Sequence, residues 1–110
     1  MAKIIVDIDE TICITPKNRN YEMSRPIKEN IEKINALYEA GHTIIYWTAR
    51  GTCTGIDWSN LVHKQLKEWG AKYHVARCGK PDYDLFICDK AINSETFFKN
   101  ESRSVLCLGV

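Results

Sequence analysis

The stretch Lys3-Ile-Ile-Val-Asp-Ile-Asp-Glu-Thr11 predicts how this chain folds and where its chemistry lies. Its apolar residues are mostly β-branched and form a short run, which is typical of a strand buried in a parallel sheet. Side chains two residues apart point to the same side of a strand, so Asp7 and Asp9 are expected to converge where this strand ends. Two carboxylates that close are unfavourable unless a cation neutralises them or one holds a proton. The stretch therefore indicates a cation-binding or proton-transferring site, or else only an acidic turn.

Strand and helix patterns alternate along the rest of the chain. A helix is expected from Pro26 to Gly41, because apolar residues recur there every three or four positions and proline suits a first helical turn. A second helix is expected between Asp57, a capping residue, and Gly70. This alternation predicts an α/β fold, a Rossmann-like parallel sheet with helices on both faces. The other expected elements are strands at 42–48, 73–76, 84–89 and 104–108, a flap at 12–25, a loop at 51–55 and a short helix at 91–98.

The composition is typical of a single soluble domain spanning residues 1–110. Apolar residues make up 45% and charged residues 26% of the chain, so a hydrophobic core can form. The formal net charge of +1 gives no electrostatic reason to expect nucleic acid or a membrane as partner. The five cysteines are an odd number without a Cys-x-x-Cys pair, and no stretch is long and apolar enough for a signal peptide or a membrane span. We therefore expect free thiols and a cytoplasmic location.

Further polar residues come just after or before the expected strands, where parallel sheets bind ligands. Thr48 closes the second strand and is followed by Ala49 and Arg50, so its hydroxyl and the next backbone N–H groups can bind phosphate oxygens. Lys80 precedes the expected fourth strand and could pair with a carboxylate and with a phosphoryl group. Asp89 ends that strand and could complete the oxygen ligands that Mg²⁺ prefers. Each residue alone is also compatible with a purely structural role.

Asp84 begins the same expected strand and lies at its other end. Five steps of about 3.3 Å put it roughly 16 Å from Asp89. We therefore interpret Asp84 as structural and keep Asp89 as the candidate metal ligand.

Together these residues resemble the motifs of the haloacid dehalogenase (HAD) superfamily of phosphohydrolases. The first motif, Asp-x-Asp-x-Thr after an apolar strand, is similar to residues 7–11, and the second is similar to Thr48 at the end of the next strand. The third resembles Lys80-Pro81 and the fourth Asp89. The segment from Gly79-Lys80-Pro81 to Asn93 is further similar to very small HAD phosphatases often found with surface-polysaccharide (capsule) biosynthesis.

The resemblance implies a Mg²⁺-dependent phosphomonoesterase that works through an aspartyl-phosphate on a phosphorylated sugar or related small metabolite. It implies Asp7 as nucleophile and Asp9 as general acid and then base. It further implies phosphate binding by Thr48, Lys80 and the neighbouring Ala49 and Arg50, and metal binding by Asp7, Asp9 and Asp89. Many relatives have a second acid where Cys88 stands, and a neutral thiol is a poor Mg²⁺ ligand.

The segments 12–25 and 51–57 are too short for a separate cap domain, so the resemblance implies a minimal (C0) cap and an open site. A homo-oligomer could cover that site, and Tyr21, Met23, Arg50 and Trp58 could meet the substrate. Three alternatives stay open. They are a nucleotide or polynucleotide end phosphatase, a phospho-switch like a response-regulator receiver, and a catalytically weakened HAD-fold binding or regulatory protein.

Overall fold

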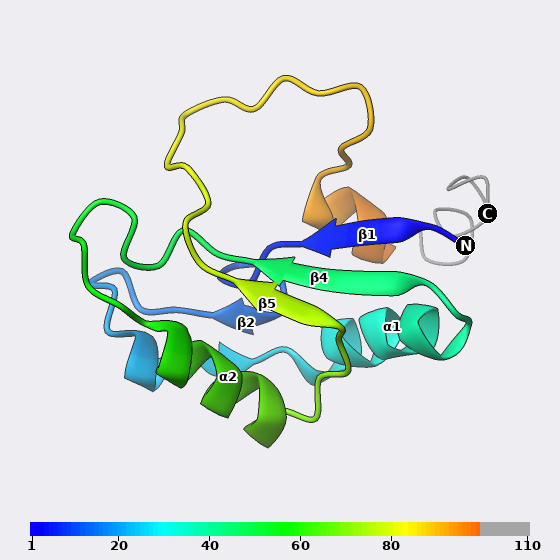
Figure 1. Ribbon diagram of the computed structural model, residues 1–110, viewed down its shortest axis with the longest axis horizontal. Coiled ribbons are helices and arrows are strands. Elements are labelled where there is room, and N and C mark those ends of the chain that lie inside the picture. The colour runs from blue at the N-terminus through cyan, green and yellow to red at the C-terminus, as the bar shows by residue number, and fades with distance from the viewer. Residues whose placement is uncertain (100–110) are drawn as a thin grey trace.

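A three-stranded parallel sheet forms the centre of the protein. The computed structural model describes residues 1–99 and is shown in Figure 1. The strands are β1 (Lys3–Val6), β4 (Thr43–Trp47) and β5 (Val75–Arg77), in the spatial order β1-β4-β5. Both strand pairs are parallel, with Ile45 of β4 opposite Ile5 on one side and Val75 on the other. The predicted α/β class and parallel sheet are therefore confirmed.

Two helices connect these strands. Helix α1 (Lys28–Glu39) lies between β1 and β4 in the chain, and α2 (Ser59–Glu68) lies between β4 and β5. Both are followed, as predicted, by glycines with positive φ angles, 100° at Gly41 and 71° at Gly70, which other residues rarely adopt. The N-cap residue of α2 is Trp58, one position later than predicted, but the carboxylate of Asp57 still accepts a hydrogen bond from the first backbone N–H of the helix at 2.9 Å.

Both helices cover the same face of the sheet (Figure 1). Ile44 and Tyr46 point from β4 into the core that the helices share, and both are fully buried. Ile45 and Trp47 on the opposite face are only half-buried. The prediction that helices cover both faces of the sheet is therefore wrong for residues 1–99. The strand order β1-β4-β5 proceeds in one direction, and two right-handed crossovers in the same direction place both helices on one side.

The segment 12–25 has more structure than the predicted irregular flap. Strand β2 (Cys13–Ile14) pairs antiparallel with β3 (Arg25–Pro26), and a 3-10 turn, η1 (Tyr21–Met23), lies between them. Pro26 therefore belongs to a strand and not, as predicted, to the first turn of α1. Proline is tolerated there because a short edge strand does not need its missing N–H.

Residues 84–89 do not form the predicted fourth strand of the sheet. They belong to an arch, residues 79–93, that leaves the sheet after β5 and returns to a helical segment at 94–99 (Figure 1). The prediction is wrong because an apolar run shows a preference for extended structure but not which strand edge lies within reach. Only residues 78–83 separate β5 from this run, whereas a parallel crossover takes a dozen residues or more.

The remaining predictions concern the end of the chain and membranes. The short helix expected at 91–98 is found at 94–99, and the expected strand at 104–108 lies outside the described residues. Across residues 1–99, no helix combines the length and the apolar character needed to cross a membrane.

Candidate active site

Asp7 and Lys80 come together at the carboxyl end of the sheet. Asp7 directly follows β1, and its carboxylate accepts a hydrogen bond from the backbone N–H of Ile8 at 2.9 Å. The ammonium of Lys80 lies 3.8 Å from the other carboxylate oxygen. Burial raises the pKa of Asp7, and the charge of Lys80 opposes this rise only in part. The Asp7 side chain remains 43% exposed, so it is accessible to a ligand.

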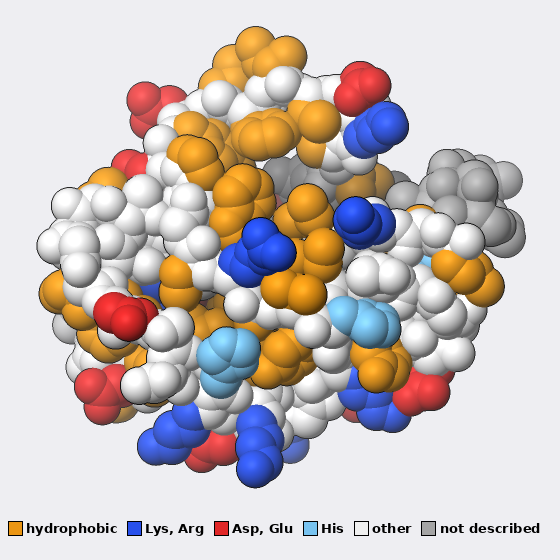
Figure 2. Space-filling view, viewed as in Figure 1, with side chains coloured by type: hydrophobic (Ala, Val, Ile, Leu, Met, Phe, Trp, Pro, Cys, Tyr) orange, Lys and Arg blue, Asp and Glu red, His pale blue; other side chains and the backbone are white. Residues whose placement is uncertain are grey.

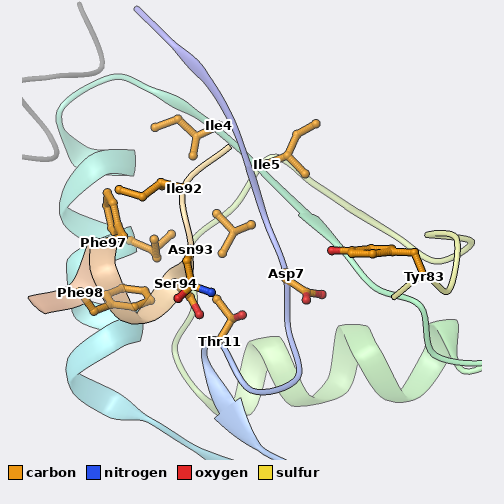
Figure 3. A pocket seen from close by; sticks show the side chains of 12 residues that line it. Ile4, Ile5, Asp7, Thr11, Tyr83, Ile92, Asn93, Ser94, Phe97 and Phe98 are labelled. Carbon is orange, nitrogen blue, oxygen red and sulfur yellow. The ribbon is translucent and has the colours of Figure 1, made fainter. Parts of the chain in front are cut away.

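The ends of β4 and β5 hold Lys80 in this place. Its backbone N–H donates to the carbonyl of Thr48 at 3.1 Å, and the N–H of Thr48 donates to the carbonyl of Arg77 at 2.9 Å. The Lys80 ammonium also lies 3.0 Å from the Tyr83 hydroxyl and 4.5 Å from the centre of that ring. Tyr83 extends toward β1 beside Asp7 (Figure 3). Lys80 is thus held by Thr48 at its backbone and by Tyr83 and Asp7 at its ammonium, and its side chain is only 13% exposed.

Asp9 is held by a buried arginine. The Arg50 guanidinium donates from Nε to Asp9 Oδ2 at 3.1 Å and from Nη2 to Oδ1 at 2.9 Å. The Thr15 hydroxyl donates a further, short hydrogen bond to Asp9. Burial by itself would raise the pKa of Asp9, but the hydrogen bonds from Arg50 and Thr15 outweigh it and lower this pKa. Asp9 is therefore kept ionised.

The Arg50 side chain is buried and bonded to other protein groups. Its Nη1 donates to the side-chain carbonyl of Gln65 at 2.6 Å, and its guanidinium carbon lies 4.6 Å from the centre of the Tyr21 ring. No part of the side chain is exposed. The backbone N–H of Arg50 donates to the buried hydroxyl of Thr48 at 3.1 Å. Thr48 and Arg50 therefore shape the loop beside Asp7, and their side chains are engaged with other protein groups.

A cavity of about 550 Å³ opens beside Asp7 and Asp9, and its lining includes neither Lys80 nor Thr48, the predicted phosphate-binding residues. Asp7 and Asp9 form part of its wall, as do Ala49 and Arg50. Tyr21 and Trp58, which were candidates for substrate contact, also line it, whereas Met23 does not. The remaining lining residues come from the flap, the loop after β4 and the arch, and they are Glu10, Asn18, Arg19, Gly51, Cys53, Thr54, Ile56 and Asp82.

Sequence reasoning missed the residues that surround the Asp9–Arg50 pair. Thr15 and Ser24 come from the flap, and Gln65 comes from α2. Polar residues in a flap and on a helix carry no periodic signal that marks them as buried. The position of Gln65 within the apolar face of α2 was the one sequence feature that pointed to a buried polar side chain.

The structure does not bring all the predicted Mg²⁺ ligands together in one place. Asp89 lies exposed in the arch and is absent from the wall of the cavity. The Asp9 carboxylate is occupied by Arg50, which leaves Asp7 as the available carboxylate. Among the described residues, no group of three or more His, Cys, Asp or Glu side chains is placed to hold a metal ion. Mg²⁺ commonly uses one or two carboxylates together with water and substrate phosphate, so of the three predicted ligands Asp7 is the one that the structure leaves for it.

The lowered pKa of Asp9 predicts a loss of stability in acid. An acid with a lowered pKa in the folded state stabilises the fold above its unfolded pKa, near 3.8, and this contribution is lost as the pH falls through the folded value. In Asp9→Asn, we expect the free energy of unfolding to decline less between pH 5 and pH 2 than in the wild type. Urea titrations over this range measure the difference, and equal declines in both proteins would contradict the prediction.

Comparison with known proteins supports the fold. A crystal structure of a target protein from Vibrio cholerae superimposes with a TM-score of 0.84 and 23% sequence identity. The match covers 98% of this chain and 96% of that one. No protein-family model and no curated protein matches the sequence. The chain therefore shares its α/β fold with this Vibrio cholerae protein.

Proposed function

We propose that this protein is a phosphomonoesterase that uses Asp7 as its nucleophile. The observation that carries the proposal is the half-exposed Asp7 carboxylate, 3.8 Å from the Lys80 ammonium in the wall of a cavity. A carboxylate can accept a phosphoryl group, and a fixed cation beside it stabilises the charge of the phosphoryl oxygens. The position of both groups at the carboxyl end of a parallel sheet supports the same interpretation.

The proposed reaction has two steps. An oxygen of Asp7 attacks the phosphorus, the bond from phosphorus to the ester oxygen breaks, and the alcohol leaves with a proton. Water then attacks the phosphorus of the aspartyl-phosphate, its proton is removed, and the bond to Asp7 breaks to release phosphate. Asp9 is proposed to donate the proton to the leaving alcohol and then, as a carboxylate, to accept one from the attacking water. Its lowered pKa keeps it in the ionised form that the second step needs but makes it a weaker base there.

A small phosphorylated metabolite, such as a sugar phosphate of polysaccharide biosynthesis, is the proposed substrate. The cavity of about 550 Å³ has the size of a small-molecule site, and it is lined by polar groups together with Tyr21 and Trp58. Mg²⁺ is proposed as cofactor. It would neutralise charge on the phosphoryl group, and of the three predicted ligands Asp7 is the one that lines the cavity without an arginine partner.

Hydrolysis of p-nitrophenyl phosphate, with Mg²⁺ or with EDTA, tests the proposal. We expect phosphate release that depends on Mg²⁺. A panel of sugar phosphates, nucleotides and phosphorylated oligonucleotides then separates the proposed substrate class from a nucleotide or polynucleotide end phosphatase. Absence of turnover on the whole panel would contradict the enzymatic proposal.

A binding or regulatory protein with weakened catalysis is the second candidate. The observation that favours it is the incomplete set of metal ligands within residues 1–99. It predicts that phosphorylated sugars bind, as measured by calorimetry, without being hydrolysed.

Replacement of Lys80 is expected to impair catalysis without unfolding the protein. In Lys80→Met, kcat/KM should fall about a hundredfold, because the developing charge on the phosphoryl oxygens loses its fixed cation. Lys64→Met, on the exposed side of α2, is the matched control and should keep wild-type kinetics. Full activity of Lys80→Met would exclude the assigned role.

A further inference from the structure

Two aromatic rings form part of the wall of the cavity beside Asp7. The rings of Tyr21 and Trp58 meet edge to face, with their centres 5.1 Å apart and an angle of 75° between their planes. Both side chains are half-buried and line the cavity. Tyr21 comes from η1 in the flap, and Trp58 directly precedes α2. Sites for small molecules are typically lined by aromatic side chains together with a few polar groups.

Neighbouring residues hold these two rings in place. The Arg50 guanidinium carbon lies 4.6 Å from the centre of the Tyr21 ring, and the Tyr21 carbonyl accepts a hydrogen bond from the side-chain amide of Gln65 at 2.7 Å. The loop after β4 comes close to Trp58 at Gly51, where a Cβ would lie 3.1 Å from Trp58 Cδ1 and 2.0 Å from a backbone carbonyl oxygen. The aromatic wall is therefore preformed, and a ligand ring can pack on it without first ordering these side chains.

The charges in the wall of this cavity do not balance. Each of its two guanidinium groups is paired with a carboxylate, Arg50 with Asp9 at 2.9 Å and Arg19 with Glu10 at 2.7 Å. Asp82 is a further carboxylate of the wall, and it has no ion-pair partner among residues 1–99. The lining described for residues 1–99 therefore holds an uncompensated negative charge and no unpaired Lys or Arg side chain.

Unpaired positive charges of the chain lie outside this cavity. The whole sequence has 15 Lys and Arg against 14 Asp and Glu, so the acidic character of the cavity is local. Figure 2 shows Lys and Arg side chains over α2, where Lys64 and Lys67 are exposed and do not line the cavity. A second anionic group on a substrate would meet Asp82 without a free cation to receive it.

Arg19 does not alter this balance. Its side chain is 52% exposed, so its guanidinium can turn from Glu10 toward an anionic ligand. The Glu10 carboxylate would then remain in the same wall without its partner and would repel that ligand. The backbone N–H of Thr15 donates to this carboxylate at 3.3 Å, which helps to keep it there.

We propose that this cavity selects phosphate esters by the charge of their leaving group. The leaving group that it accepts is a neutral or cationic sugar ring, which packs on the wall formed by Tyr21 and Trp58 and presents a hydroxyl or ammonium group to Asp82. A leaving group with a carboxylate or a second phosphate is rejected, because that group lies in the field of Asp82 with no cation to pair with. This inference deepens the proposed function and rests on it.

Three sugar phosphates with the same ring and the same linkage test this selectivity. Glucose 1-phosphate, glucosamine 1-phosphate and glucuronic acid 1-phosphate differ in one substituent, which is neutral, cationic and anionic, respectively. With Mg²⁺ present, we expect kcat/KM for the glucuronic acid ester to be at least about tenfold below that for the glucose ester, because like charges repel in the cavity. The glucosamine ester should be hydrolysed at least as well as the glucose ester. Hydrolysis of the glucuronic acid ester as efficient as that of the glucose ester would overturn the proposal.

Substitutions of Asp82 test whether this residue sets the selectivity. In Asp82→Asn, the ratio of kcat/KM for the glucose ester to that for the glucuronic acid ester should fall at least about threefold, and in Asp82→Lys it should fall further. The ratio compares two substrates on one protein, so a partial loss of folded protein does not change it. Asp84→Asn removes an exposed carboxylate outside the lining of the cavity and should keep the wild-type ratio. An unchanged ratio in both Asp82 variants would overturn the role of Asp82.

Substitutions of Trp58 test the contact with the sugar ring. Trp58→Leu should raise KM for glucose 1-phosphate about tenfold and change kcat much less, because the ring packs on Trp58 away from the reacting atoms. Trp58→Phe keeps an aromatic ring and should recover most of the lost binding. A wild-type KM in Trp58→Leu would overturn the contact.

Calorimetric titration with the three esters separates this inference from the proposed function. A wild type that hydrolyses none of them would contradict the proposed function, and their Kd values would then decide the selectivity alone. We expect the glucuronic acid ester to bind at least about tenfold more weakly than the glucose ester. Equal or tighter binding of the glucuronic acid ester, or no binding of any of the three, would overturn the selectivity.

Discussion

Asp7→Asn is expected to lower kcat for phosphate release at least about a thousandfold while the fold stays intact. An amide cannot accept the phosphoryl group, and loss of a nucleophile removes the covalent route entirely. Steady-state kinetics with p-nitrophenyl phosphate measure the effect, and circular dichroism verifies the fold. Asp84→Asn is the matched control, since Asp84 is an exposed aspartate that lies outside the lining of the cavity.

The pH dependence of activity provides a second test of Asp7 as the nucleophile. The Asp7 carboxyl must be ionised to attack, and burial raises its pKa above the ordinary value of 3.8. Activity should therefore fall as the pH is lowered through this raised pKa, at a higher pH than a solvated aspartate would give. An acid limb at or below pH 3.8 would contradict the raised pKa of Asp7, whereas Asp7→Asn with wild-type kcat would rule out Asp7 as the nucleophile.

Arg50→Met is expected to destabilise the fold by about 3–5 kcal/mol. The substitution leaves the Asp9 carboxylate, whose side chain is 17% exposed, without its guanidinium partner, and an unpaired charge in the interior costs about this much. Chemical denaturation at pH 7 measures the free energy of unfolding. Arg19→Met is the matched control, because the Arg19–Glu10 pair is about half exposed and such pairs contribute at most about 1 kcal/mol.

A double variant separates the charge from the loss of packing. The double variant Asp9→Asn, Arg50→Met removes the unpaired Asp9 carboxylate. This double variant should therefore be more stable than Arg50→Met alone. Equal stability of the single and double variants would show that Arg50 acts through packing and not through its charge. Unfolding of Arg19→Met to the same extent as Arg50→Met would contradict the distinction between buried and exposed pairs.

Local patterns account for the predictions that the structure confirms. Helix α1 follows from the spacing of Ile31, Ile34 and Leu37, all buried, and its end follows from Gly41. These features depend on residues three or four positions apart, and such short-range patterns can be recognised directly in the sequence. Pro26 shows the limit of this reasoning. Proline suits both a first helical turn and a short edge strand, and only its pairing with Cys13 selects the strand.

Local sequence was enough to show that Asp7 follows a strand of the parallel sheet and that Lys80 precedes an apolar run. The predicted burial of that strand is wrong, because Ile5 in its middle is 58% exposed. Position alone left a purely structural role open for Lys80, and the resemblance was what implied that Lys80 and Asp7 act on one phosphoryl group. The pairing of Asp9 with Arg50, 41 positions away, and the arch formed by residues 84–89 became visible only in the folded chain. Both outcomes depend on which distant groups lie within reach. That reach is set by chain connections and strand order, which no local pattern encodes.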